Sequence, residues 1–115
     1  MDLGPEDALT RLEALEQAAE CLRTLAHPHR LRMVQILLEK EHTVGQLAEA
    51  CSIRSHVASE HLRRMKDRGL LASRRDGQRT WYRVQELGVA GIIRCVEARY
   101  QVGSDCEAPE VENEA

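Results

Sequence analysis

The dipeptide Asp76-Gly77 stands between two short runs of strand-forming residues, 71–75 and 78–84. Such a dipeptide at the centre of a two-residue loop is the strongest local signal for a β-hairpin, because both loop positions need a positive φ. The chain before and after this hairpin has helical periodicity instead. The sequence therefore predicts a mostly α-helical fold with one small hairpin.

Local start and stop signals set the expected helix boundaries. Pro28 suits the first turn of a helix, and Gly69 suits a helix C-terminus. Thr43 and Gln46 have the spacing of a capping box, in which each side chain bonds to the backbone N–H of the other residue. With these signals, helices are expected over residues 5–25, 28–40, 44–51, 55–68 and 86–101.

The 115 residues suffice for one domain, which we expect over residues 5–102. Segment 103–115 is acidic with almost nothing to bury, so we expect a disordered tail there. The first helix could pack its apolar residues on its own domain or against a second copy of the chain, and both readings stay open. These residues have a heptad-like spacing and are Leu12, Leu15, Ala19, Leu22 and Ala26.

Charge is unevenly distributed along the chain. The net charge is −3, but residues 54–83 contain nine basic and three acidic side chains and so carry +6. This local field, rather than the average, is what the phosphate backbone of a nucleic acid meets. A basic middle between acidic ends therefore points to a nucleic-acid partner.

The helix expected over residues 55–68 has a polar face, which consists of Ser55, His56, Ser59, Glu60, Arg63 and Arg64. The hairpin adds Arg75 and Gln78 beside its tip, and Arg74 and Arg79 as the next cross-strand pair. The major groove of B-DNA, about 12 Å wide, admits one helix, and a basic ribbon can reach the backbone or the minor groove. We therefore expect a winged helix-turn-helix domain that binds double-stranded DNA, with solvated surface charge as the alternative for any single arginine.

No motif of a catalytic site is present, so we do not expect an enzyme. The seven glycines form neither a G-x-G-x-x-G pattern nor a P-loop. Residues 1–7 are acidic and lack the basic and apolar regions of a signal peptide, so we do not expect one there. No apolar run approaches the roughly 20 residues that span a bilayer, and the four cysteines are scattered. We expect a cytoplasmic protein with free thiols and no membrane partner. A winged-helix module that binds protein and a repressor that needs no inducer stay open as alternatives.

Several segments, taken in order, resemble the ArsR/SmtB family of regulators. They are Leu25-Ala26-His27-Pro28-His29-Arg30-Leu31-Arg32, Val44-Gly45-Gln46-Leu47-Ala48, Ser59-Glu60-His61-Leu62-Arg63-Arg64-Met65, Arg68-Gly69-Leu70-Leu71 and Arg75-Asp76-Gly77-Gln78-Arg79-Thr80-Trp81-Tyr82-Arg83-Val84. The resemblance covers about residues 22–100 and implies a homodimeric repressor whose first and last helices form the dimer. It also implies release from the operator by an inducer, often a metal ion, a metalloid or a reactive sulfur species. A two-fold dimer predicts a near-palindromic operator.

The metal sites known in this family are altered in the present chain. The family's arsenic and cadmium sensors carry Cys-Val-Cys where this chain has Thr43-Val44-Gly45. Its zinc sensors use carboxylate and histidine ligands on the last helix, where Glu86 resembles the first ligand. The other ligand positions hold Gly88, Arg99 and Val102. An arginine cannot ligate zinc as a histidine does, so neither site is expected here.

The spacing of the histidines predicts no local metal pair. His27 and His29 are two residues apart and cannot share a helix face, and His56 and His61, five apart, lie on different faces. His61 shares a face with Val57 and Met65, so we expect it to be a core or a capping histidine.

Cysteines remain as candidates for sensing. Cys51 ends the third expected helix, and Cys95 lies beside the apolar stripe of the last one. Free cysteine is often buried, so each is either structural or part of a redox or thiophilic-metal switch. A disulfide between them would need Cα atoms within about 7 Å. A thiophilic metal ion is the one cofactor that this reading allows.

Overall fold

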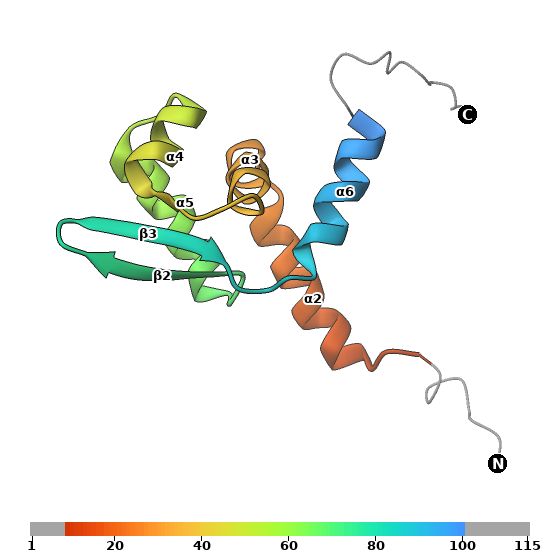
Figure 1. Ribbon diagram of the computed structural model, residues 1–115. Coiled ribbons are helices and arrows are strands. Elements are labelled where there is room, and N and C mark those ends of the chain that lie inside the picture. The colour runs from red at the N-terminus through yellow and green to blue at the C-terminus, as the bar shows by residue number, and fades with distance from the viewer. Residues whose placement is uncertain (1–8, 101–115) are drawn as a thin grey trace.

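The structure, a computed structural model, describes residues 9–100 and consists of helices with one small sheet, as the sequence predicts (Figure 1). The expected tail over 103–115 and the expected helical residues 5–8 lie outside this range. No helix within it is long and apolar enough to cross a membrane. The elements are α2 (Leu12–Leu25), α3 (Pro28–Leu37), β1 (His42–Thr43), α4 (Val44–Cys51), α5 (Ser55–Asp67), β2 (Leu71–Asp76), β3 (Arg79–Val84) and α6 (Val89–Tyr100).

Helices α4 and α5 begin and end within one residue of the positions that local signals predict. α4 covers its expected range, and both capping-box bonds are present: Thr43 Oγ1 accepts from the Gln46 N–H at 3.1 Å, and Gln46 Oε1 accepts from the Thr43 N–H at 2.9 Å. Gly69, with φ +81°, follows the end of α5. The turn between α4 and α5 contains Ser52 at φ +57°, a left-handed residue that no glycine marks in the sequence.

Three expected helix boundaries are wrong. The first helix begins at Leu12 because Arg11 has extended backbone and no side chain caps the helix. The second ends at Leu37, where a tighter i→i−3 bond from the Glu39 N–H closes the last turn. The last begins at Val89 because i→i−3 bonds hold residues 86–91 in a tighter turn before the α-helix.

The sheet has three strands in the order β1-β3-β2, all antiparallel. The sequence does not reveal β1, because two residues are too few to show an alternation of apolar and polar side chains. β1 pairs with the middle of β3, His42 with Tyr82 and Thr43 with Trp81. It thereby joins the hairpin of β2 and β3, which we call the wing, to the start of α4.

The tip of the hairpin differs by one residue from the prediction. Gly77 and Gln78 form the loop, and Asp76 pairs with Arg79 across it. Only Gly77 has a positive φ, +66°, as in a loop with glycine at the first central position of a type II′ turn. The expected pairing of Arg74 with Arg79 is therefore wrong, and Arg74 instead faces Trp81.

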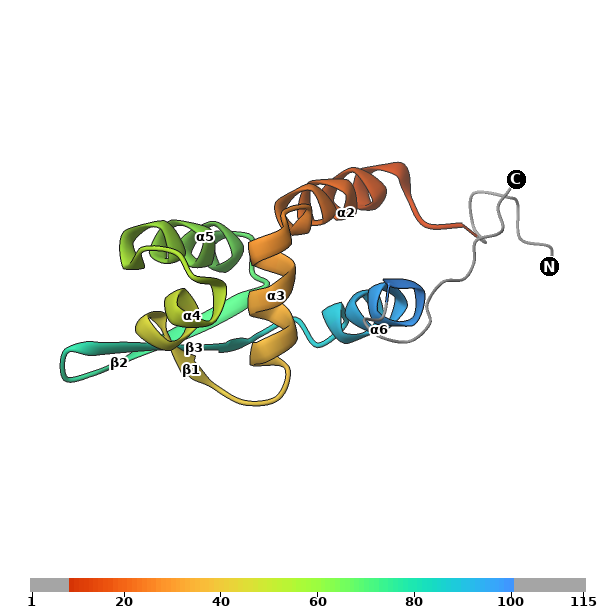
Figure 2. The same ribbon diagram turned by 90° about the horizontal axis from the view of Figure 1, so that it is seen from above.

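One aliphatic core lies between α3, α4, α5 and the sheet. Its fully buried side chains include Met33, Leu47, Leu62 and Met65, and Tyr82 is its one aromatic member. α2 and α6 extend from this core on the same side, away from the wing (Figure 2). Only Leu25 of α2 is buried, so most of that helix has no partner within the described chain.

Candidate nucleic-acid interface

α5 presents its polar face to solvent, because its inner face is bound to the core. Ala58, Leu62 and Met65 are buried along that inner face. Of the six side chains predicted on the outer face, Ser59 is half-buried. The other five are exposed, namely Ser55, His56, Glu60, Arg63 and Arg64.

The two arginines of this face are available for a ligand. Neither the Arg63 nor the Arg64 side chain makes a hydrogen bond or an ion pair with any residue between 9 and 100. Arg68, one turn further on, differs because its Nη2 pairs with Glu20 Oε1 at 3.0 Å. This ion pair ties the end of α5 to α2 and leaves the outer face of α5 open.

The arginines of the wing differ from one another in their surroundings. Arg79 is exposed at the tip without a hydrogen-bond or ion-pair partner among the described residues, and Arg75 donates only a long bond of 3.4 Å to the Gly77 carbonyl. Arg74 is bound by Glu41, with Nη2 2.9 Å from Oε1, and its guanidinium lies 5.3 Å from the centre of the Trp81 ring. The hydrogen bond from Arg74 holds the pKa of Glu41 below its ordinary value. Arg74 is thus already neutralised by Glu41.

A groove joins the helix and the wing. It lies between the N-terminus of α4, the middle of α5 and the hairpin tip, and Ser59, Gln78 and Arg79 are among the residues that line it. Gly45 and Glu49 of α4 also line it. The outer face of α5 and the tip of the wing therefore border one continuous surface, although they are far apart in the sequence.

A second surface is apolar. The exposed fractions of Leu12, Leu15 and Leu22 on α2 are 68%, 49% and 50%. These leucines do not pack on the described part of their own domain, and their packing against a second copy of the chain stays a prediction. Tyr100 at the end of α6 is likewise exposed.

The two candidate sensing cysteines lie apart. Cys51 is half-buried at the end of α4, where its thiol donates a weak bond of 3.9 Å to the His29 carbonyl. Burial raises its pKa, which disfavours the reactive thiolate. Cys95 is exposed on α6. α4 and α6 lie on opposite sides of α3 in both views, so the fold does not bring the two thiols of one chain together (Figures 1 and 2).

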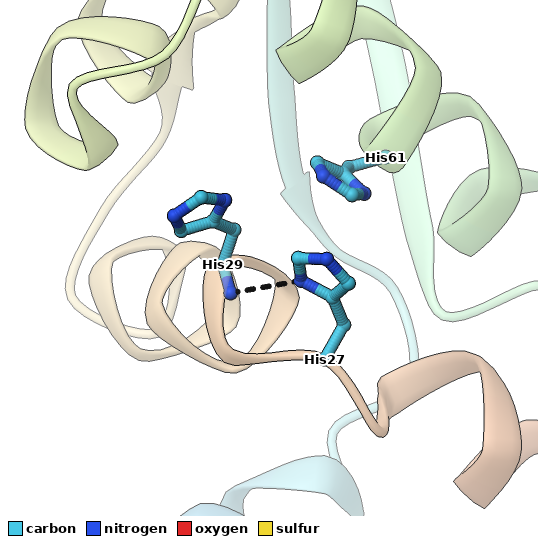
Figure 3. Close-up of side chains that lie close together, drawn as sticks. All are labelled: His27, His29 and His61. Atoms are coloured by element: carbon cyan, nitrogen blue, oxygen red, sulfur yellow. Dashed lines mark hydrogen bonds between the residues drawn. The ribbon is translucent and has the colours of Figure 1, made fainter.

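Histidines form a cluster that the sequence analysis does not predict. His27, His29 and His61 offer ligand atoms that all lie within 4.8 Å of one another, so the expectation that His27 and His29 lie too far apart to form a pair is wrong (Figure 3). The argument that residues two apart lie on different faces of a helix does not apply to His27, because His27 is the N-cap of α3, with φ −157°, and not a helical residue. His61 comes from α5, and only the packing of α3 against α5 brings it to the other two.

Comparison with known proteins gives consistent matches. A family model described as a helix-turn-helix domain matches residues 25–74. The HTH-type transcriptional regulator YgaV of Escherichia coli K12 is 36% identical over 94 residues, which cover 80% of this chain and 95% of YgaV. A Streptomyces lividans protein named "Probable mercury resistance operon repressor" is 33% identical over 94 residues, or 79% of this chain and 75% of that protein.

A solved structure agrees with these matches. It is the solution structure of the homodimeric winged helix-turn-helix DNA-binding domain of Mb0332 from Mycobacterium bovis, described as a possible ArsR-family transcriptional regulator. Its TM-score is 0.67 at 30% identity, and the match covers 79% of this chain and 86% of that one. The described elements of the two chains therefore follow the same fold.

Proposed function

The chain belongs to the ArsR/SmtB family of winged helix-turn-helix transcriptional regulators, and we propose that it represses transcription as a homodimer on a near-palindromic operator. Members of this family are DNA-binding repressors rather than enzymes. The observation that carries the proposal is the exposed polar face of α5, whose two arginine side chains have no partner among the described residues, beside an exposed basic wing tip.

In this proposal α5 lies in the major groove and selects the sequence. His56, Glu60 and Arg63 point away from the buried face of the helix and supply a ring donor or acceptor, a carboxylate and a guanidinium for base edges. Ser55 and Arg64 flank them, and Ser59, at the edge of the groove, adds a small hydroxyl. An arginine that bonds both acceptors of a guanine is the commonest specific contact of this kind.

The wing holds the DNA backbone. Arg75, Gln78 and Arg79 are exposed at its tip and carry no strong partner that phosphate would have to displace. Arg74 contributes less, because Glu41 already occupies its guanidinium. Backbone contacts of this kind position the protein without reading the sequence.

The dimer forms through α2 and α6, which expose the large apolar side chains of Leu12, Leu15, Leu22 and Tyr100 among the described residues. Burial of Leu12, Leu15 and Leu22 against a second copy would remove this apolar surface from water, which is the main favourable term in association. The relative Mb0332 is a homodimer. Two copies of α5 would then meet half-sites about one helical turn apart.

A salt titration tests DNA binding against the alternative of a protein-binding module. The protein is titrated onto a duplex that it selects from a random library, and affinity is measured by fluorescence anisotropy at several salt concentrations. DNA binding predicts that the logarithm of affinity falls linearly with the logarithm of salt concentration, by about 0.9 for each phosphate contact. A flat response, or no selected duplex, contradicts the proposal.

An inducer that reacts with thiols, or a thiophilic metal, is the second part of the proposal. Cys95 supports it because it is exposed and lies on α6, a helix of the proposed dimer interface. Release from DNA by polysulfide, oxidant and mercuric ion is compared between the wild type and the double variant Cys51→Ser, Cys95→Ser. Equal release refutes a role for these thiols, and release of neither protein favours a repressor without such an inducer.

A further inference from the structure

The cluster of His27, His29 and His61 lies where three helices meet. His27 precedes α3 at its junction with α2, His29 is in the first turn of α3, and His61 points toward both from α5 (Figure 3). The ring centroids of His27 and His61 are 4.4 Å apart, those of His27 and His29 5.3 Å, and those of His29 and His61 6.0 Å. His27 and His29 are half-buried, and His61 is the most enclosed of the three.

Three imidazoles at these distances suit a divalent ion of the zinc type. Nitrogens bound to one tetrahedral zinc ion at about 2.0–2.1 Å lie about 3.3–3.4 Å from one another. Ligand atoms within 4.8 Å of one another therefore need to close by roughly 1.5 Å at most, within the reach of side-chain rotations. Burial is the main cause that lowers the pKa of both His27 and His61, and this favours the neutral form that binds a metal.

Two hydrogen bonds compete with such an ion. His27 Nδ1 accepts from the His29 backbone N–H at 3.1 Å, and His61 Nδ1 accepts from Arg30 Nε at 3.0 Å. A neutral imidazole has one unprotonated nitrogen, so an accepting Nδ1 leaves the proton on Nε2. An ion on Nδ1 replaces the Arg30 donor directly, and an ion on Nε2 shifts the proton to Nδ1, which then cannot accept. Either way, the ion and the Arg30–His61 bond exclude each other.

We propose that His27, His29 and His61 form a binding site for a divalent metal ion of the zinc type, and that this ion displaces Arg30 from His61. A bound water or other small ligand completes the coordination. The site uses no residue from the last helix and no cysteine, and it is independent of the thiol hypothesis above. It deepens the proposed function, on which its regulatory part rests.

The displaced bond is a link between the two surfaces of the protein. Arg30 Nη1 also donates to the Thr24 carbonyl at 2.8 Å, so this one guanidinium joins the end of α2 to α5. α2 belongs to the proposed dimer interface. His61 is two residues from Arg63 on α5, the helix that is proposed to contact the bases. Loss of the Arg30–His61 bond removes one of two polar links between α2 and α5 and leaves the Arg68–Glu20 ion pair as the other. The spacing of the two copies of α5 in the dimer is then less well fixed. We expect the bound ion to lower operator affinity at least tenfold.

The test measures metal binding first and without DNA. Full-length protein under reducing conditions is titrated with Co²⁺, followed by its visible absorption, and Zn²⁺ is then used as competitor. His29→Ala is the informative variant: its ring makes no hydrogen bond to a described residue, and the cap on His27 uses its backbone N–H. We expect at least a tenfold loss of affinity in His29→Ala and none in His42→Ala, whose ring bonds to the Lys40 carbonyl instead. Equal affinity in both variants, or cobalt bound through thiolate alone, overturns the site.

Arg30→Met separates coordination from mere packing. If the ion competes with the Arg30–His61 bond, this variant binds Zn²⁺ more tightly than wild type, whereas a packing cluster that Arg30 holds together binds it less tightly or not at all. Operator affinity is then measured with and without Zn²⁺. Metal binding with unchanged operator affinity overturns the regulatory part alone. A protein that binds Zn²⁺ through these histidines but selects no duplex refutes the proposed function and leaves the site intact.

Discussion

Replacement of Arg79 by alanine should lower the salt dependence of DNA binding. Arg79 is exposed at the wing tip and has no hydrogen-bond or ion-pair partner within residues 9–100, so its charge is free to replace counterions on a phosphate. A dimer carries two wings, and the substitution removes two such contacts. Each contact contributes about 0.9 to the slope of log affinity against log salt, so the slope should become shallower by about 1.8.

The same arithmetic sets the expected change in affinity. Between about 50 and 200 mM salt, a fourfold range, the wild type should lose about twelvefold more affinity than Arg79→Ala, because fourfold raised to the power 1.8 is about twelve. Fluorescence anisotropy on one duplex at four or five salt concentrations gives both slopes. Thermal unfolding of both proteins shows whether the substitution has changed the fold.

Arg74→Ala is the matched control in the same hairpin. Its guanidinium is bound by Glu41 at 2.9 Å and lies over Trp81, so it should release no counterion on DNA binding and leave the slope unchanged. Equal changes in slope for the two variants would show that the Glu41 pair opens in the complex. An unchanged slope for Arg79→Ala would refute the assignment of the wing tip to the backbone.

Four further predictions concern the dimer, the fold, base selection and the thiols. Leu15→Asp should prevent dimer formation, because it places a charge in the apolar seam of α2; an unchanged sedimentation coefficient contradicts this. Thr43→Ala should lower the free energy of unfolding by about 1–2 kcal/mol, because it removes the cap of α4, and an unaltered urea midpoint would exclude that role. Arg63→Ala should cost about 1–3 kcal/mol on the selected duplex and relax base preference, which a retained selection profile would disprove. Cys95 should react with a thiol reagent before Cys51, because burial raises the pKa of Cys51 and Cys95 is exposed; labelling followed by mass spectrometry that finds the reverse order speaks against this.

The ends of α4 and α5 could be predicted from the residues near them. The Thr43–Gln46 capping box and Gly69 act within four residues of their own position, and both are present as expected. The hairpin was also evident, but its register was not. The two loop residues are Gly77 and Gln78 instead of Asp76 and Gly77, and of these only Gly77 has a positive φ. This shift of the loop by one residue changes every cross-strand pair and places Arg74 one residue further from the tip.

The ends of the outer helices were harder to predict. Their apolar spacing can continue beyond the residues that are helical, as at Ala26, which follows the end of α2 at Leu25. At the start of α2 no capping bond marks the boundary, because Arg11 supplies none. Periodicity shows which face of a helix is apolar, and it does not show where the backbone leaves the helix.

The sequence by itself determined the order of the helices and of the hairpin strands, the polar face of α5 and the basic hairpin, because caps, turns and periodicity depend on residues that are near one another in the chain. Tertiary structure alone decided which charges are free and which side chains meet. Glu41 neutralises Arg74 from 33 positions away, and packing of α3 against α5 brings His61 to His27 and His29. Such contacts depend on how helices and strands pack, and no local spacing of residues encodes that geometry.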